Sequence, residues 1–279
     1  MNASAMNPRN SQHVRSKSVP TNPHPALTQV DEQLNRLRAS EATSSSLGLR
    51  LDALQDLHGS VDKLLLLPLS QQALVKEVLD DLQEGSLRLL DLCDIAKNAL
   101  LQTRECTHEL ASIFRRRRSD NIGASSSLKK CLSSRKMVKK SIHKVLKGME
   151  SKAPNKDHGS LSIVRQIKEV EAVTYHCIEA LLFFIAGPKL VSKWSCWASF
   201  SKLVQPKRVA CISEGTNISV IERLDLILSS ITNHQTEVED MQHLLRQCGE
   251  SIKEVEEKLE GLYRLIIKTR VSLLNIFNH

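Results

Sequence analysis

Aromatic side chains are scarce in this sequence, because Phe, Trp and Tyr together make up 3% of the 279 residues. The apolar fraction is nevertheless 41%, and Leu, Ile, Val and Ala supply most of it. Strands favour aromatic and β-branched residues, whereas Leu is a strong helix former. The chain therefore has enough apolar residues for a core, and their types favour helices over a sheet.

Recognisable catalytic motifs are also missing. The sequence has no glycine-rich phosphate loop, no His-Glu-x-x-His pair, no Gly-x-Ser-x-Gly elbow and no clustered pair of Asp residues. His176 and Cys177 are adjacent, but neighbours on a helix point about 100° apart and cannot act by themselves as base and nucleophile. The ten histidines show no metal-ligand spacing. We therefore expect neither enzymatic activity nor a bound cofactor or metal.

Long apolar runs and paired cysteine motifs are absent as well. The most apolar run, Ile178–Ala186, has nine residues, whereas a membrane-spanning helix needs about 20. The first 25 residues contain no apolar signal core. None of the seven cysteines forms a Cys-x-x-Cys pair, and four fall within apolar helical patterns: Cys93, Cys106, Cys177 and Cys248. We expect buried free thiols in a soluble intracellular protein, cytoplasmic with a membrane-peripheral or nuclear location as alternatives.

Acidic residues almost disappear from one segment. From Arg115 to Lys147 there are twelve Lys or Arg and one acid, Asp120, which gives +11. Because the whole chain carries +8, the rest of it carries a net −3. The most clustered cations, which we call the basic patch, are Arg115, Arg116, Arg117, Arg118, Lys129, Lys130, Lys139 and Lys140.

The basic patch has several interpretations. A solvated helix face is the plainest, since charge runs are usually that. Binding to an anionic lipid surface and recognition as a nuclear import signal are the main functional alternatives. Nucleic acid is disfavoured as a partner, because no aromatic residue is interleaved with these charges to stack on bases.

The first 25 residues are rich in Asn, Ser and Pro and contain no acid. Four prolines exclude a stable helix there, so we expect a disordered arm; an acid-poor organellar transit peptide is the alternative. Arg15, Ser16, Ser18 and Pro20 match the Arg-Ser-x-Ser-x-Pro pattern that 14-3-3 adaptors bind once Ser18 is phosphorylated. The phosphate supplies acceptors for an Arg cluster. An ordinary Ser-rich tail is the alternative interpretation.

Apolar periodicity predicts an all-α bundle of long antiparallel helices behind this arm. We expect an arm over 1–25, a helical half over 26–150, a polar linker over 151–160 and a second helical half over 161–279 that joins the first in one bundle. The expected helices are Ala26–Ser40, a second ending at Leu67, a long one through Leu82–Ile113, a basic one over Ser126–Gly148 after a turn at Asn121–Gly123, a buried one over Leu161–Ala186 and a final one through Leu224–Ile276.

Two of these helices carry heptad seams. Apolar or small residues recur at alternating steps of three and four from Leu82 to Ile113 and from Leu224 to Ile276, where His234 and Thr269 are the polar exceptions. We expect the two seams to pack antiparallel, with the 161–186 helix buried in the centre. A break near Asn233 would shorten the final helix. Self-association through the C-terminal heptads is the alternative to packing within one chain.

Several dense blocks carry a family resemblance. His13-Val14-Arg15-Ser16-Lys17-Ser18-Val19-Pro20 precedes Asn22-Pro23-His24-Pro25, and further blocks lie at Leu37–Thr43, Leu54–Leu57, Leu67–Leu74, Gly85–Asp91, Ala99–Gln102 and Arg115–Arg118. With these blocks, nearly the whole chain resembles the plant-specific BYPASS-related family. The resemblance implies a plant protein that is helical throughout, has no known enzymatic activity and is linked to root and shoot development. It brings no catalytic residues, and it disfavours a transit peptide because the arm belongs to the family pattern.

The residues and the resemblance together predict a non-enzymatic interaction or scaffold protein, with phosphorylation of the arm as a switch. The alternative function is that of a peripheral membrane protein, held to anionic lipid by the basic segment over 115–147.

Overall fold

The computed structural model describes residues 24–42, 47–116, 121–149, 162–187, 220–231 and 238–278. Within these ranges the chain is helical and contains no strand, which confirms the all-α prediction. Residues 1–23 of the predicted arm, Arg117, Arg118 and the 151–160 linker lie outside the described residues, so the predictions made for them stay predictions. The helices are α1 (Pro25–Ala42), α2 (Leu47–Leu65), α3 (Pro68–Ala73), α4 (Lys76–Arg116), α5 (Asn121–Met149), α6 (Ser162–Ala186), α8 (Val220–Ile231) and α9 (Val238–Phe277).

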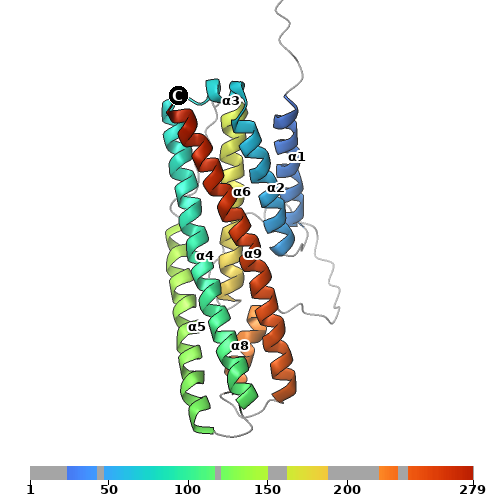
Figure 1. The fold of residues 1–279 in the computed structure, drawn as a ribbon, viewed down its shortest axis with the longest axis vertical. Coiled ribbons are helices and arrows are strands. Elements are labelled where there is room, and N and C mark those ends of the chain that lie inside the picture. Colours follow the sequence, from blue (N-terminus) through green and yellow to red (C-terminus); the bar gives the residue numbers. More distant parts are fainter. Residues whose placement is uncertain are drawn as a thin grey trace, which may run out of the picture.

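Two long helices form the frame of the bundle. In Figure 1, α4 descends from the end of the molecule that carries α3, and α9 returns beside it, so the two pack antiparallel as predicted. The helices α1, α2 and α6 surround the upper part of this pair, and α5 and α8 surround the lower part (Figure 1). Helices from both sides of residues 151–160 therefore contribute to one bundle.

The predicted seam of α4 is buried along nearly its whole length, and only Ile113 at its end is half-buried. A second buried stripe, which the heptad pattern does not show, runs beside the seam: Leu79, Ser86, Leu90, Cys93, Leu100, Thr107 and Phe114. It exists because α4 packs on α5 and α6 as well as on α9. This helix therefore needs more than one apolar face.

The heptads of α9 pack within the chain, against α4 and α2. Nine seam residues are buried there: Leu245, Cys248, Ile252, Val255, Leu259, Leu262, Ile266, Thr269 and Leu273. The predicted seam through Leu224–Ile276 is divided between α8 and α9, and the intervening residues 232–237 lie outside the described part. The 40 residues of α9 span about 60 Å at 1.5 Å per residue.

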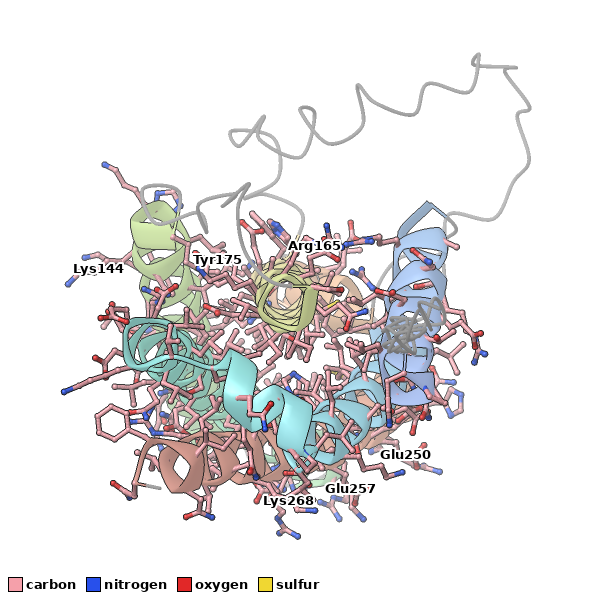
Figure 2. The ribbon with its side chains drawn as sticks, turned by 90° about the horizontal axis from the view of Figure 1, so that it is seen from above. Lys144, Arg165, Tyr175, Glu250, Glu257 and Lys268 are labelled. Atoms are coloured by element: carbon pink, nitrogen blue, oxygen red, sulfur yellow. The ribbon has the colours of Figure 1, made fainter. Side chains whose placement is uncertain are left out.

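The helix α6 occupies the centre of the upper bundle, as predicted. It contacts α1, α2, α3, α4, α5 and α8, and Figure 2 shows it nearly end-on between α5 on one side and α1 on the other. It ends where Gly187 adopts a φ of +83°, and the Gly187 amide donates to the Phe183 carbonyl at 3.0 Å. Glycine tolerates this left-handed conformation, which is a common way to terminate a helix.

The turn predicted at Asn121–Gly123 is wrong, because these residues form the start of α5. Asn and Gly are accepted near a helix N-terminus as well as in turns, since the first amides of a helix have no intrahelical partner in any case. Composition alone therefore could not decide between the two structures.

Candidate interaction surface

Helix α5 has no acidic residue over its 29 positions. Its inner stripe is buried against α4 and α6 and includes Cys131, Val138, Ile142 and Leu146. No described helix other than α4 and α6 covers α5 extensively, so α5 forms one side of the lower bundle. Lys144 on this helix points away from the molecule in Figure 2. The helix therefore presents an uncovered surface whose charge is entirely positive.

The structure distributes the predicted basic patch over different environments. Arg115 is exposed, and its Nε donates to the Ala111 carbonyl at 3.3 Å. Lys129, Lys130 and Lys140 are exposed on α5, and the Lys130 Nζ lies 3.9 Å from a Glu109 carboxylate oxygen. Arg116 ends α4 and its side chain is not described, while Arg117 and Arg118 lie beyond the described residues. The described cations of the basic patch therefore have different environments and do not form one site.

Lys139 does not fit the interpretation of the basic patch as a solvated helix face. It is half-buried, and its Nζ donates to Asp225 of α8. The same carboxylate accepts from Arg135 Nε at 2.9 Å and from Arg135 Nη2 at 3.3 Å. Lys139 therefore neutralises an internal charge instead of meeting a partner.

Sequence reasoning missed Arg135 and Asp225 as a structural pair. Only 3% of the Arg135 side chain is exposed. One signal was available: Arg135 recurs in register with Cys131, Val138 and Ile142, so it lies on the buried stripe of α5. No pattern in the sequence identifies Asp225, which lies 90 positions later on another helix, as its partner.

Five lysines define what we call the basic face of α5. Two of them, Lys129 and Lys140, belong to the predicted basic patch, and the others are Lys136, Lys144 and Lys147. All five are exposed, and none forms an ion pair within the described part of the chain. At about 100° per residue they fall within an arc of about 80°, opposite the buried stripe, and they extend for about 27 Å along the helix. Met137 lies at the edge of this arc with 62% of its surface exposed.

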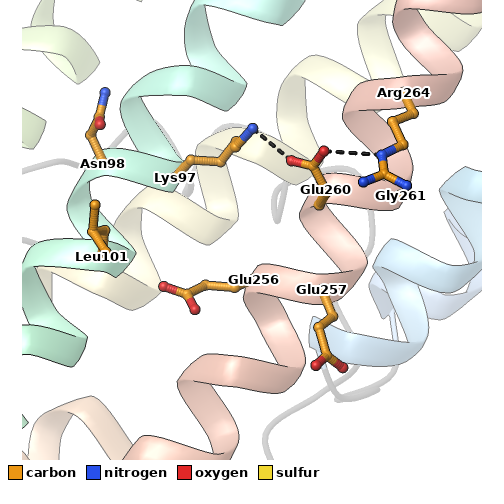
Figure 3. Close-up of a pocket in the computed structure, with 8 residues that line it drawn as sticks. All are labelled: Lys97, Asn98, Leu101, Glu256, Glu257, Glu260, Gly261 and Arg264. Atoms are coloured by element: carbon orange, nitrogen blue, oxygen red, sulfur yellow. Dashed lines mark hydrogen bonds and ion pairs between the residues drawn. The ribbon is translucent and has the colours of Figure 1, made fainter. Parts of the chain in front are cut away.

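A shallow groove of about 560 Å³ lies between α4 and α9 (Figure 3). Three of its charged groups pair with each other: Glu260 lies 2.6 Å from Lys97 Nζ and 3.0 Å from Arg264 Nε. The hydrogen bond to Glu260 raises the pKa of Lys97, and the hydrogen bond from Lys97 lowers the pKa of Glu260. Paired charges of this kind tie two helices together and do not favour proton transfer at neutral pH.

The adjacent His176 and Cys177 have separate environments. His176 Nδ1 lies 3.3 Å from Glu179, whereas Cys177 is buried and its Sγ accepts from Arg50 Nη2 at 3.3 Å. Among the described residues, no group of three or more His, Cys, Asp or Glu is arranged to hold a metal ion. In the same part of the chain, no helix combines the length and the apolar character needed to cross a bilayer.

The phosphorylation motif of Arg15, Ser16, Ser18 and Pro20 lies outside the described residues, so the structure does not place it. All five cysteines in the described part are buried free thiols, which confirms the prediction for Cys93, Cys106, Cys177 and Cys248 and adds Cys131.

The family model described as Protein BPS1 matches residues 50–276, which is most of the chain. No curated protein and no solved structure matches the chain.

Proposed function

Because the chain belongs to the BPS1 family, a BYPASS-related plant family, we propose that it is a non-enzymatic interaction protein of root and shoot development. In this proposal it acts as a scaffold that binds an acidic protein partner through the basic face of α5. The observation that carries the proposal is the set of five exposed lysines that form no ion pair with any described residue, on a helix that has no acidic residue.

Electrostatic reasoning supports an acidic partner. A single exposed ion pair contributes only about 0–1 kcal/mol, so one lysine would not make a binding site. Several like charges on one rigid surface act together, because they steer an oppositely charged partner and reject basic ones. This face lies within the 115–147 segment, which carries +11, whereas the chain outside that segment carries a net −3, so the segment differs in sign from the remainder of the protein.

An affinity pull-down from plant tissue tests the proposal. We compare the wild type with a variant that changes Lys136, Lys140 and Lys144 to Gln, which keeps helix propensity. The matched control changes Arg36, Lys63 and Lys253 to Gln, which removes the same charge from α1, α2 and α9. We expect specific partners to be lost from the first variant only. Equal recovery of partners from all three proteins contradicts the proposal.

A peripheral membrane protein is the second candidate, and the exposed Met137 beside the lysines favours it. Lysines attract anionic headgroups, and an apolar side chain among them can enter the interface. In flotation with phosphatidylcholine vesicles, with and without phosphatidylserine, this candidate predicts binding that requires the anionic lipid. Binding should disappear as ionic strength rises from about 0.1 M to about 1 M, because the Debye length falls from about 10 Å to about 3 Å. Equal flotation with both vesicle types would exclude it.

We also propose that phosphorylated Ser18 recruits a 14-3-3 adaptor, since Arg15 and Pro20 complete the recognition pattern. The expected result is binding of a recombinant adaptor to the kinase-treated wild type and not to the Ser18→Ala variant. A Ser11→Ala variant, which lies in the same arm but outside the recognition pattern, serves as the control for general loss of phosphate. Binding that persists in Ser18→Ala contradicts this part of the proposal.

A further inference from the structure

Three buried thiols from three helices lie in the lower bundle: Cys106 on α4, Cys131 on α5 and Cys248 on α9. None of them has a part in the proposed function. Cys106 and Cys131 have 4% and 1% of their surfaces exposed. Buried cysteines usually act as small apolar residues, so a reactive role needs a specific arrangement between them.

Cys106 and Cys131 have such an arrangement. The Cys106 Sγ lies 3.8 Å from the Cys131 carbonyl oxygen, and the Cys131 Sγ lies 3.7 Å from the Cys106 carbonyl oxygen. Each sulfur therefore contacts the backbone of the other residue, across the interface of α4 and α5. A disulfide needs this kind of approach, because the Cα atoms of bridged cysteines usually lie about 4.4–6.8 Å apart.

The surroundings make the two sulfurs chemically different. A hydrogen bond from the Cys131 thiol lowers the pKa of Cys106, and the positive charge of Arg135 acts in the same direction. The pKa of Cys131 is raised by its hydrogen bond with Cys106 and by burial, and its Sγ also lies 3.6 Å from a Glu109 carboxylate oxygen. The thiolate is the nucleophile in thiol chemistry, so Cys106 is the sulfur that reacts first.

We propose that Cys106 and Cys131 are an oxidation site that a peroxide converts into a disulfide between α4 and α5. In the first step the Cys106 sulfur attacks one peroxide oxygen, the O–O bond breaks, and Cys106 becomes a sulfenic acid while water leaves. In the second step the Cys131 sulfur attacks the Cys106 sulfur, the S–O bond breaks, and a second water carries away the Cys131 proton. Two thiols lose two electrons in total, and one peroxide is reduced to two waters.

The other described thiols are less suited to this reaction. Burial raises the pKa of Cys93 and of Cys248 to about 12, so both stay protonated near neutral pH. Cys177 accepts a hydrogen bond from Arg50 on α2, away from the α4–α5 interface. Cys248 is the nearest competitor, because its charge interacts with that of Cys106, and the experiment must distinguish it.

The disulfide would close the chain between Cys106 and Cys131 and fasten α5 to α4. Cys131 lies on the buried stripe of α5, so the reaction leaves the basic face exposed and fixes the helix that carries it. Crosslinking also restricts the unfolded chain, which favours the folded state.

Peptide mapping of the full-length protein tests the site directly. The reduced protein is exposed to a small excess of hydrogen peroxide, its remaining thiols are alkylated, and it is digested without reductant. Trypsin places the two cysteines on separate peptides, Glu105–Arg115 and Cys131–Arg135, and places Cys248 on Gln247–Lys253. We expect the first two peptides to be joined, two of the seven cysteines to escape alkylation, and dithiothreitol to reverse both effects.

Variants test the order of the two steps. Cys131→Ser should abolish the joined peptide and let dimedone label a sulfenic acid at Cys106, whereas the matched control Cys93→Ser should keep the yield of joined peptide within about twofold. The wild-type digest needs no variant, so an unfolded variant does not obscure the result. A joined peptide that contains Cys248, or alkylation of all seven thiols after peroxide, overturns the proposal.

Discussion

His58 on α2 is nearly fully buried, and its Nε2 lies 2.9 Å from Thr174 Oγ1 on α6. The Thr174 hydroxyl donates to the Val170 carbonyl at 2.7 Å, so it accepts from the Nε2–H of a neutral imidazole. The Nδ1 atom is buried without a hydrogen-bond partner in the described structure. Burial accordingly lowers the pKa of His58 to about 4, because a proton on Nδ1 would place an unpaired charge in the core.

This environment predicts a pH-dependent loss of stability. The unfolded chain binds a proton at His58 near pH 6.5, but the folded chain binds it only near pH 4. The contribution of His58 to the free energy of unfolding should therefore be constant above pH 6.5 and should decrease as the pH falls toward 4. At pH 5 the free energy of unfolding should be about 2 kcal/mol lower than above pH 6.5. Urea unfolding at pH 7 and pH 5 measures the difference. His58→Gln should reduce the difference in the free energy of unfolding between pH 7 and pH 5, and the exposed control His243→Gln should leave this difference unchanged. An equal difference in the wild type and both variants contradicts the prediction.

Gly187 allows a second residue-scale prediction. A Cβ at this position would lie 2.9 Å from Asp225 Oδ2, and the φ of +83° disfavours any other residue. We expect Gly187→Ala to lower the free energy of unfolding by about 1–2 kcal/mol. Gly249 is the matched control: it lies inside α9 with nothing within 4 Å of an added Cβ. Gly249→Ala should raise stability by about 0.5–1 kcal/mol, because glycine is a poor helix former. Two changes of the same sign in denaturant unfolding would contradict this explanation.

At the scale of elements, α8 is fastened to α5 by Asp225. Removing this carboxylate in Asp225→Ala leaves Arg135 buried and without its counterion, so we expect a loss of about 2–3 kcal/mol. Hydrogen exchange should accelerate in α8 while the centres of α4 and α9 stay protected. Glu260→Ala is the control, because its ion pairs with Lys97 and Arg264 are partly open to solvent and contribute about 0–1 kcal/mol. Similar losses of free energy of unfolding in the two variants would show that the buried Asp225 ion pair contributes no more than a partly exposed one.

The sequence predicts elements better than it predicts their ends. Periodicity located the seams of α4 and α9 correctly, because apolar positions on a packed helix must recur at steps of three and four. It did not show the second buried stripe of α4, which includes Leu90, Cys93 and Leu100. This stripe is buried because α4 packs against more than one helix, and such contacts are decided by the tertiary fold. The start of α5 at Asn121 and the six-residue α3 were missed, because short-range signals at these positions suit turns and helix starts equally.

At the scale of the whole molecule, the packing of α9 bears on self-association. Its seam residues are buried against α4 and α2 of the same chain, so a dimer formed through these heptads would first require α9 to leave the bundle. We therefore expect a monomer near 31.3 kDa in sedimentation velocity at micromolar concentration. A species of twice that mass would contradict the expectation, and point to another surface or to exchange of α9 between chains.

The class of the fold and the antiparallel pairing of its longest helices could be predicted from the sequence, because both follow from helix period and length. The candidate site could be predicted only in part. A run of cations shows where charge is concentrated, but it does not show which of them are exposed. Lys139 and Lys140 are neighbours in the sequence, yet Lys139 is half-buried and paired with Asp225 whereas Lys140 is exposed. Their separation depends on Asp225, and a contact between helices so far apart in the chain is decided by tertiary packing.

The pairing of α4 with α9 also affects the order in which the protein can fold. These helices are separated by more than 120 positions, and contacts between distant segments form late because their loop closure costs the most entropy. During synthesis, α2 and α4 leave the ribosome well before α9 exists, so the apolar residues that α9 will cover stay exposed until α9 emerges. The nascent protein thus carries an unpaired hydrophobic surface while the more than 120 residues between α4 and α9 are made, which is the condition in which chains depend on chaperones.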